Sequence, residues 1–210
     1  MKKDSLSFIS NPVFQIIGDT ADQYGVQVYV VGGYVRDQFL DNKCKDIDVV
    51  VIGDGPQFAR QAANALGTRH ISVYKRFGTA MLRYKDFTLE FVGARKESYQ
   101  RDSRKPIVEQ AELSDDIARR DFTINAMAIA LNRENRGDLV DLYHGVHDLE
   151  HHLIRTPLNP ERTFFDDPLR IMRAVRFASR FQFKIEKKTL KGLKNEAHRL
   201  SIISQERDHR

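Results

Sequence analysis

The chain has 210 residues, of which 41% are hydrophobic and 30% are charged, so it can bury a core as one domain or as a domain with a smaller lobe. No apolar run approaches the roughly 18 residues of a membrane helix, and the charged start MKKDSLSF lacks the apolar stretch of a signal peptide. The single cysteine, Cys44, cannot form an internal disulfide. These features predict a cytoplasmic protein with no membrane partner.

The net charge of +5 is distributed unevenly. Residues 1–150 hold 20 Lys and Arg against 22 Asp and Glu, whereas residues 151–210 hold 14 against 7. A basic C-terminal part suits a polyanionic partner such as RNA or a nucleoside triphosphate. A solvated helical surface is the alternative explanation of this charge.

Helical and strand patterns alternate in the first half of the chain. The predicted elements are a helix at 12–25, a strand at 26–33, a helix opening at GYVRDQFL, a strand at 46–53 and a helix at 55–67. The runs TAMLRY and FTLEFV follow, separated by Lys85 and Asp86, and predict an antiparallel hairpin. We therefore expect a mixed sheet with helices packed against it.

The second half is less regular at first. Residues 93–117 are polar and poorly periodic, which predicts a mobile loop. Order resumes at 119–131, and GDLVDLYHGVHDLEHHLIRT predicts a short strand, a small helix and another short strand. From Asp166 onward the pattern predicts helices, first DDPLRIMRAVRFASRF and then EKKTLKGLKNEAHRL.

Two adjacent glycines, Gly32 and Gly33, stand between the first predicted strand and its helix. Glycines let a backbone approach a ligand closely, and the free N–H groups of a helix start favour phosphate. A structural turn is the alternative. The G-x-G-x-x-G spacing of a dinucleotide site is missing, which argues against a Rossmann-type oxidoreductase.

Asp46 and Asp48 lie two residues apart on a predicted strand. Their side chains project from one face, while Ile47, Val49 and Val51 face the other side and can be buried. Neighbouring like charges are costly without a cation. Carboxylates are natural ligands of Mg²⁺, which keeps substrate phosphates in its remaining positions.

Glu90, inside the predicted strand FTLEFV, is the third carboxylate of interest. It is either a third residue of the metal site, which we favour, or a lone charge at the edge of a sheet. For the aspartates, an exposed acidic edge is the alternative, and the glycine turn just upstream argues against it. The sequence thus predicts that Asp46, Asp48 and Glu90 are catalytic and that Asp46 and Asp48 hold Mg²⁺.

Arginines follow one side of the predicted helix that starts near Asp166. At about 100° per residue they fall within an arc of about 120°; they are Arg170, Arg173, Arg176 and Arg180. The opposite side, which we expect to be packed, carries Ile171, Met172, Val175 and Ala178. A solvated face is the alternative, but arginines without acids among them favour phosphate or base contacts.

Five stretches in this order resemble the N-terminal half of the class II tRNA nucleotidyltransferases, the CCA-adding enzymes, and their bacterial poly(A) polymerase relatives. They are GGYVRD, KDIDVVV, RRDFTINAMA, DLYHGVHDLEHHLIRT and DDPLRIMRAVRFASRFQF. The resemblance implies an α+β fold of the DNA polymerase β-like nucleotidyltransferase superfamily. Its head, with a mixed sheet and flanking helices, would span residues 1–158, and an all-helical neck that reads the base would span residues 159–210.

The resemblance also implies roles for single residues. Asp46 and Asp48 match the metal-binding aspartates. The residues implied to bind the nucleotide are Gly32, Gly33 and Arg36 of the glycine turn, Arg120 and Asp121 of the R-R-D motif, Asp167 and Arg170 of the E-D-x-x-R motif, and Arg173 and Arg176. That last motif reads D-D-x-x-R here, with Asp166 in place of Glu, so the role of Asp166 stays open.

The resemblance implies an enzyme that uses CTP and ATP to add CMP and AMP to the 3′ end of tRNA without a template. Mg²⁺ would be its cofactor and pyrophosphate its second product. An A-adding or poly(A) polymerase is the alternative within the family, and an inactive nucleotide- or RNA-binding module is the alternative outside it. The family continues into further helical domains that hold tRNA, so we expect this chain to be a fragment of head and neck.

Overall fold

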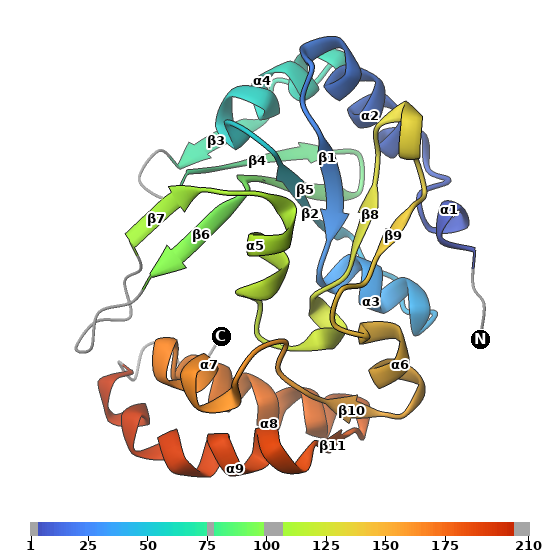
Figure 1. Ribbon diagram of the computed structural model, residues 1–210. Coiled ribbons are helices and arrows are strands. Elements are labelled where there is room, and N and C mark those ends of the chain that lie inside the picture. Colours follow the sequence, from blue (N-terminus) through green and yellow to red (C-terminus); the bar gives the residue numbers. More distant parts are fainter. Residues whose placement is uncertain (1–3, 75–77, 99–106, 204–210) are drawn as a thin grey trace.

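The protein, shown as a computed structural model in Figure 1, is built around a central β-sheet. The structure describes residues 4–74, 78–98 and 107–203. Within these ranges the strands are β1 (Val28–Val31), β2 (Asp46–Val51), β3 (Ile71–Tyr74), β4 (Thr79–Tyr84), β5 (Phe87–Gly93), β6 (Arg95–Ser98), β7 (Ile107–Gln110), β8 (Ala128–Ala130), β9 (Leu139–Val140), β10 (Leu153–Ile154) and β11 (Lys184–Ile185).

The main sheet is mixed. In the described residues its strand order is β3-β4-β5-β2-β1-β8-β9. Strands β2 and β5 pair in parallel, and the other neighbours in this sheet are antiparallel. The predicted hairpin is confirmed, because β4 and β5 pair with Tyr84 opposite Phe87. The predicted mixed sheet and α+β class are confirmed as well.

Helices α2 (Pro12–Tyr24) and α4 (Gly55–Ala65) begin where the sequence predicts them, at residues 12 and 55. The helices of the described residues are α1 (Ser5–Phe8), α2 (Pro12–Tyr24), α3 (Gly33–Phe39), α4 (Gly55–Ala65), α5 (Leu113–Ala118), α6 (Gly145–Glu150), α7 (Pro160–Asp166), α8 (Leu169–Phe181) and α9 (Lys187–Glu196), with the 3-10 turns η2 (Thr123–Asn125), η3 (Arg133–Asn135) and η4 (Ala197–Ile202). The side chain of Asn11 accepts a hydrogen bond from the Val13 N–H at 3.1 Å, and Asp54 accepts one from the Gln57 N–H at 2.9 Å. Each of these N-caps satisfies an otherwise unpaired donor of the first helical turn.

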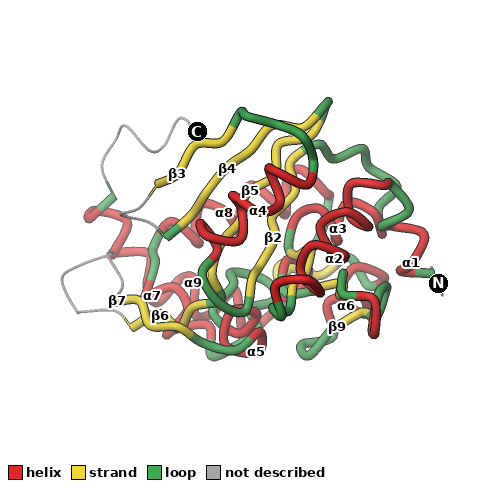
Figure 2. Tube along the Cα trace, turned by 90° about the horizontal axis from the view of Figure 1, so that it is seen from above, coloured by secondary structure: helices red, strands yellow, loops and turns green. Residues whose placement is uncertain are grey.

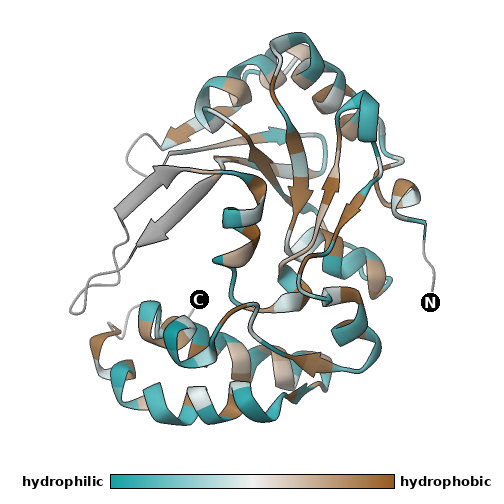
Figure 3. Cartoon of the chain, in the orientation of Figure 1, coloured by the Kyte–Doolittle hydropathy of each residue, from teal (hydrophilic) through white to brown (hydrophobic). Residues whose placement is uncertain are grey.

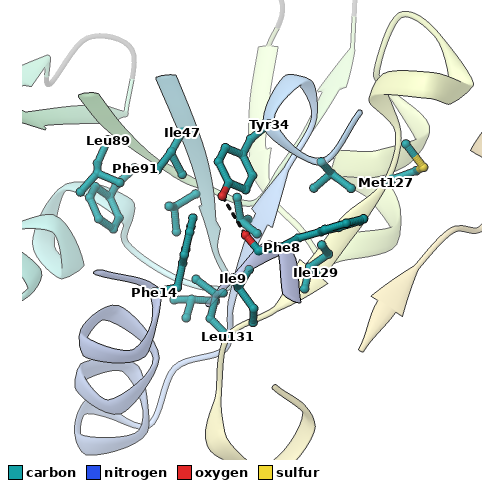
Figure 4. Packing of buried hydrophobic residues seen from close by; sticks show 14 of the residues in the cluster. Phe8, Ile9, Phe14, Tyr34, Ile47, Leu89, Phe91, Met127, Ile129 and Leu131 are labelled. Carbon is teal, nitrogen blue, oxygen red and sulfur yellow. Dashed lines mark hydrogen bonds between the residues drawn. The ribbon is translucent and has the colours of Figure 1, made fainter. Parts of the chain in front are cut away.

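One face of the sheet carries the larger core. Ile47 and Val49 of β2 are buried there with Phe14 of α2 and Phe58 of α4. Figure 2 shows α2 and α4 lying over the strands, and Figure 4 shows part of this packing. A Cβ added to Gly18 in α2 would lie 1.9 Å from the Leu131 carbonyl oxygen, so glycine permits the close approach of helix and sheet.

The other face carries a smaller core. Val31 of β1 and Val50 of β2 are buried there with Ala128 of β8. Ile117 of α5 is fully buried against them. Burying a branched aliphatic side chain of this size contributes roughly 1.5–3 kcal/mol. This small cluster therefore fixes α5 on the sheet face that also carries the aspartates of β2.

The predicted loop at residues 93–117 is wrong in its described parts. Strands β6 and β7 form a hairpin, and helix α5 follows it; residues 99–106 lie outside the described residues. Glu112 and Asp115 form a capping box at the start of α5, and Ile117 anchors the helix to the sheet. With 6 residues the helix is too short to show a periodic pattern, so its order depends on tertiary packing.

The C-terminal helical segment, α7 to η4, gathers at the end of the molecule below the sheet (Figure 1). Figure 3 shows hydrophobic colour concentrated on the central strands and hydrophilic colour along much of α7 and α9. The expectation of an all-helical segment needs one correction: β11 pairs in parallel with β10. Among the described residues, no helix has the length and apolar character to span a membrane.

Candidate nucleotide and metal site

The candidate site is built on β2 at the centre of the sheet. Asp48 is paired in register with Val31 of β1 and with Glu90 of β5. Side chains of registered neighbours project from the same face, so Asp46, Asp48 and Glu90 share one face of the sheet. Ile47 is buried on the opposite face, as the alternation of the sequence predicts.

The carboxylate of Asp48 lies in a crowded electrostatic environment, although the residue keeps access to solvent. Surrounding protein raises the pKa of Asp48, and the charges of Asp46 and Asp116 raise it further. The guanidinium groups of Arg120 and Arg173 oppose this shift without cancelling it. A site that disfavours its own negative charge is one that a bound cation would stabilise.

The strand register places Glu90 beside Asp48, but the side chains of these described residues are not arranged as a metal centre. Among the residues that the structure describes, no group of three or more His, Cys, Asp or Glu side chains is arranged to hold a metal ion. Glu90 also has an interaction with another group of the protein. Its role in the metal site stays a prediction, as does metal binding by Asp46 and Asp48.

The glycine turn lies directly against these carboxylates. Gly32 has φ +72° and ψ −128°, a conformation that L-residues rarely adopt. A Cβ added there would lie 2.8 Å from Nη1 of Arg120 and 3.6 Å from Oδ2 of Asp48. Gly33 is the first residue of α3. The turn therefore brings main chain, Asp48 and Arg120 together.

A buried carboxylate that the sequence analysis missed holds Arg120 in place. Asp116 of α5 is fully buried and accepts hydrogen bonds from Nη2 of Arg120 at 2.9 Å and from Nε of Arg119 at 3.0 Å. Burial alone would raise the pKa of Asp116, but the two guanidinium groups lower it below its ordinary value. The Asp-to-Arg spacings of three and four residues on a helix are a signal for such pairs, and the loop assignment hid it.

Arg36 points into the protein. Its Nε donates to Oδ1 of Asp37 at 2.9 Å, and its Nη1 donates to Oδ1 of Asn125 at 2.7 Å. The guanidinium carbon lies 5.3 Å and 5.0 Å from the ring centroids of Phe177 and Phe181 on α8. Arg36 therefore joins the sheet domain to the C-terminal helical segment, and its predicted triphosphate contact stays a prediction.

Asp121 and Arg173 form a second connection between these parts. Nε of Arg173 donates to Oδ2 of Asp121 at 2.6 Å, and Asn125 Nδ2 donates to Oδ1 of Asp121 at 3.0 Å. Burial would raise the pKa of Asp121, but the Arg173 charge and the hydrogen bonds from Asn125 and Arg173 lower it overall. A buried, charged carboxylate thus fixes Arg173 against the R-R-D segment.

The remaining predicted residues lie at or near the start of α8. Asp167 accepts a hydrogen bond from the Leu169 N–H at 3.1 Å, and Nη2 of Arg170 donates to the Arg119 carbonyl at 2.7 Å. Asp166 ends α7, where its Oδ2 lies 3.8 Å from Nε of Arg162. The Arg176 guanidinium lies 5.5 Å from the ring centroid of Phe177. The structure brings Arg170 to the same segment as Arg120, whereas base contacts by Asp167, Arg170 and Arg176 stay predictions.

The packed side of α8 differs from the prediction. Its buried residues are Ile171, Ala174 and Phe177, while Met172 and Val175 are 44% and 52% exposed. The Phe177 ring contacts Phe122 edge to face, with centroids 5.9 Å apart. This aromatic contact and the ion pair between Asp121 and Arg173 set the side of α8 that faces the sheet domain, which differs from the side expected from the positions of its arginines.

The fold and the site together define a mixed-sheet domain with carboxylates on one face of β2 and β5, joined to a helical segment through the Arg36–Phe177 contact and the Asp121–Arg173 pair. A family model described as the poly A polymerase head domain matches residues 28–155. The chain belongs to this family. The family resemblance inferred from the five sequence motifs is thereby confirmed.

The chain is also similar to curated proteins of known activity. It is 44% identical over 169 residues to the A-adding tRNA nucleotidyltransferase of Aquifex aeolicus, covering 80% of this chain and 20% of that protein. It is 38% identical over 200 residues to the CCA-adding enzyme of Lactobacillus helveticus, covering 93% of this chain and 46% of that enzyme. The chain thus spans less than half the length of these relatives.

Solved structures agree in fold. A CCA-adding enzyme in apo form II matches with a TM-score of 0.85 and 36% identity, covering 95% of this chain and 49% of that one. A tRNA nucleotidyltransferase complexed with a primer tRNA and an incoming ATP analogue matches with a TM-score of 0.75 and 40% identity, covering 87% of this chain and 50% of that one.

Proposed function

We propose that this chain is the nucleotide-binding and catalytic part of a tRNA nucleotidyltransferase that adds CMP and AMP to tRNA 3′ ends. The observation that carries the proposal is the placement of Asp46 and Asp48 on one sheet face, with Arg120 and the Gly32 turn against them. In this proposal residues 1–158 are the head, and residues 159–210 are a neck that reads the base. The names of the similar curated proteins support this assignment.

The donor set fits Mg²⁺, since Asp46 and Asp48 offer hard oxygen ligands, and burial together with the charges of Asp46 and Asp116 raises the pKa of Asp48, which a bound cation would oppose. When bound, metal ions would make the RNA 3′-hydroxyl a better nucleophile and neutralise charge on the departing pyrophosphate. Arg120 and the main chain at Gly32 would hold phosphate oxygens beside Asp48, which their closeness to that carboxylate supports. In this class of reaction the protein contributes mainly position and charge.

Base choice would come from Asp167 and Arg170. A carboxylate accepts from an exocyclic amine, and a guanidinium donates to ring nitrogen or carbonyl oxygen. Cytosine and adenine both present that combination on their Watson–Crick edge, whereas guanine and uracil present N–H where Arg170 needs an acceptor. A mismatched base would leave buried polar groups unpaired at a cost of about 1–3 kcal/mol for each group.

Addition of A alone is the second candidate function. It is favoured by the A-adding tRNA nucleotidyltransferases of Aquifex aeolicus and Geobacter sulfurreducens, which are 44% and 39% identical to this chain. The carboxylate pair and the R-R-D motif serve both reactions. The choice between them therefore depends on the nucleotides that the site accepts.

Equilibrium binding of CTP, ATP, GTP and UTP to the 210-residue chain with Mg²⁺ tests the proposal. We expect CTP and ATP to bind and GTP and UTP to bind at least about fivefold more weakly, because one unpaired buried group costs about 1 kcal/mol or more. Binding of ATP alone would favour the A-adding activity. Equal binding or no binding of the four nucleotides would contradict the base-reading model.

The metal site is tested with Asp46→Ala and Asp48→Ala. We expect both variants to keep their circular-dichroism spectrum and lose the Mg²⁺-dependent part of nucleotide binding. Asp86→Ala is the matched control, because Asp86 is an exposed carboxylate whose Oδ2 lies 3.7 Å from Nζ of Lys45. Near-normal Mg²⁺ dependence in either test variant would exclude the assigned metal ligands.

A further inference from the structure

Asn125 lies at the centre of a hydrogen-bond network between the sheet domain and α8. It is buried at the end of η2. Its Oδ1 accepts from Nη1 of Arg36 at 2.7 Å, and its Nδ2 donates to Oδ1 of Asp121 at 3.0 Å. A primary amide suits this place because it offers an acceptor to the cation and a donor to the anion.

The hydrogen-bond network contacts α8 at both of its ends. Arg36 lies over the rings of Phe177 and Phe181, and Asp121 binds Arg173. The network therefore begins and ends on α8, and the Asn125 amide connects its two halves. Buried networks of this kind select one geometry, because each unpaired member would lose its compensation for desolvation.

The same hydrogen-bond network extends to the candidate metal site. Arg36 belongs to α3, which starts at Gly33 next to the turn against Asp48. Arg173 and Arg170 belong to α8, and Arg170 donates to the Arg119 carbonyl beside Arg120. A change in the tilt of α8 would move both α8 arginines relative to the carboxylates of β2.

We propose that Asn125 is a positioning residue that fixes α8, and with it Arg170 and Arg173, relative to the carboxylate strand β2. The effect on substrate rests on the function proposed above, with a nucleoside triphosphate as the ligand. The effect on geometry does not depend on it. Asn125 does not touch the nucleotide in this proposal and acts through Arg36 and Asp121.

The test compares Asn125→Ala with Asn132→Ala. Asn132 also uses both ends of its amide, accepting from the Val28 N–H at 2.9 Å and donating to the Val26 carbonyl at 2.9 Å, but these partners belong to β1 and the residues before it, not to α8 or the Arg36–Asp121 network. Spin labels at Gln57→Cys on α4 and Val175→Cys on α8, in a Cys44→Ser background, report the distance distribution between the two parts. Titration with the triphosphate that the unlabelled chain binds reports affinity.

We expect Asn125→Ala to broaden the distance distribution and to weaken nucleotide binding about tenfold, because binding would then have to restore the α8 position that these hydrogen bonds no longer hold, at a cost of about 1.4 kcal/mol. Asn132→Ala should lower the denaturation midpoint and leave both readouts unchanged. If Asn125→Ala does not fold, Arg173→Gln removes the ion pair with Asp121 from the same network. Because the Arg173 side chain is 38% exposed, this variant should fold, and it should broaden the distance distribution as well.

Unchanged distance distributions in Asn125→Ala, or in Arg173→Gln where the first variant does not fold, would overturn the positioning role. Broadening of equal size in Asn132→Ala would overturn it too, since the effect would then reflect general loss of stability. Absence of nucleotide binding by the wild-type chain would contradict the proposed function alone. Broadening specific to Asn125→Ala would support the inference in that case as well.

Discussion

Replacement of Asp121 by Asn tests how strongly the buried ion pair stabilises the protein. The Asp121 carboxylate accepts hydrogen bonds from the Phe122 N–H at 2.8 Å, from Asn125 Nδ2 at 3.0 Å and from Arg173 Nε at 2.6 Å. An asparagine has one acceptor oxygen. Its amide NH₂ would face a donor from Asn125 or Arg173, so at least one of these bonds is replaced by donor–donor repulsion.

The expected loss of stability is about 2–3 kcal/mol. A hydrogen bond to a charged group contributes about 1.5–3 kcal/mol, and breaking a fully buried ion pair costs about 3–5 kcal/mol. The lower end applies because the Arg173 side chain is 38% exposed, so water compensates part of the lost charge. Asp54→Asn is the matched control, since Asp54 is an exposed N-cap and Asn caps helices equally well.

Urea denaturation followed by circular dichroism measures both variants. Since the pKa of Asp121 is lowered by folding, its stabilising effect is present above its unfolded pKa of about 3.9 and is lost as the pH falls through its folded value. The gap between wild type and Asp121→Asn should therefore close in acid. A gap below about 1 kcal/mol at neutral pH, less than one such hydrogen bond, or a gap that persists in strong acid, would refute this reasoning.

Two further predictions concern other positions. Gly32→Ala should lower the free energy of unfolding by about 3 kcal/mol, because the backbone at Gly32 is strained for alanine and the new Cβ would lie 2.8 Å from Nη1 of Arg120. Gly25→Ala should lower it by about 1 kcal/mol, because Gly25 has φ +64° but open space around its Cα. Equal losses of the two variants in urea denaturation would contradict the Arg120 contact. Burial raises the pKa of Tyr34 to about 12, so spectrophotometric titration should find a tyrosine ionising there that Tyr34→Phe removes. The stability due to neutral Tyr34, whose hydroxyl donates to the Phe8 carbonyl at 2.8 Å, is full below the unfolded pKa of about 10 and should be lost as the pH rises through about 12; a titration without such a step would show that Tyr34 is not buried in solution.

The sequence by itself determined features that depend on neighbouring residues. The two-residue period of a strand placed Asp46 and Asp48 on one face and Ile47 and Val49 on the other. Proline, glycine and capping side chains marked the ends of α2 and α4. Five motifs in order identified the family, which the match to residues 28–155 confirms.

The tertiary structure decided which distant groups meet. Arg36 binds Asn125 across 89 residues of sequence, and Arg173 binds Asp121 across 52. Long, flexible arginine side chains find their partners through folding of the whole chain, and no local period encodes that choice. The buried side of α8 and the order of α5 were also decided by tertiary contacts: aromatic and ionic contacts set the side of α8 that is buried, and the packing of Ile117 on the sheet holds α5.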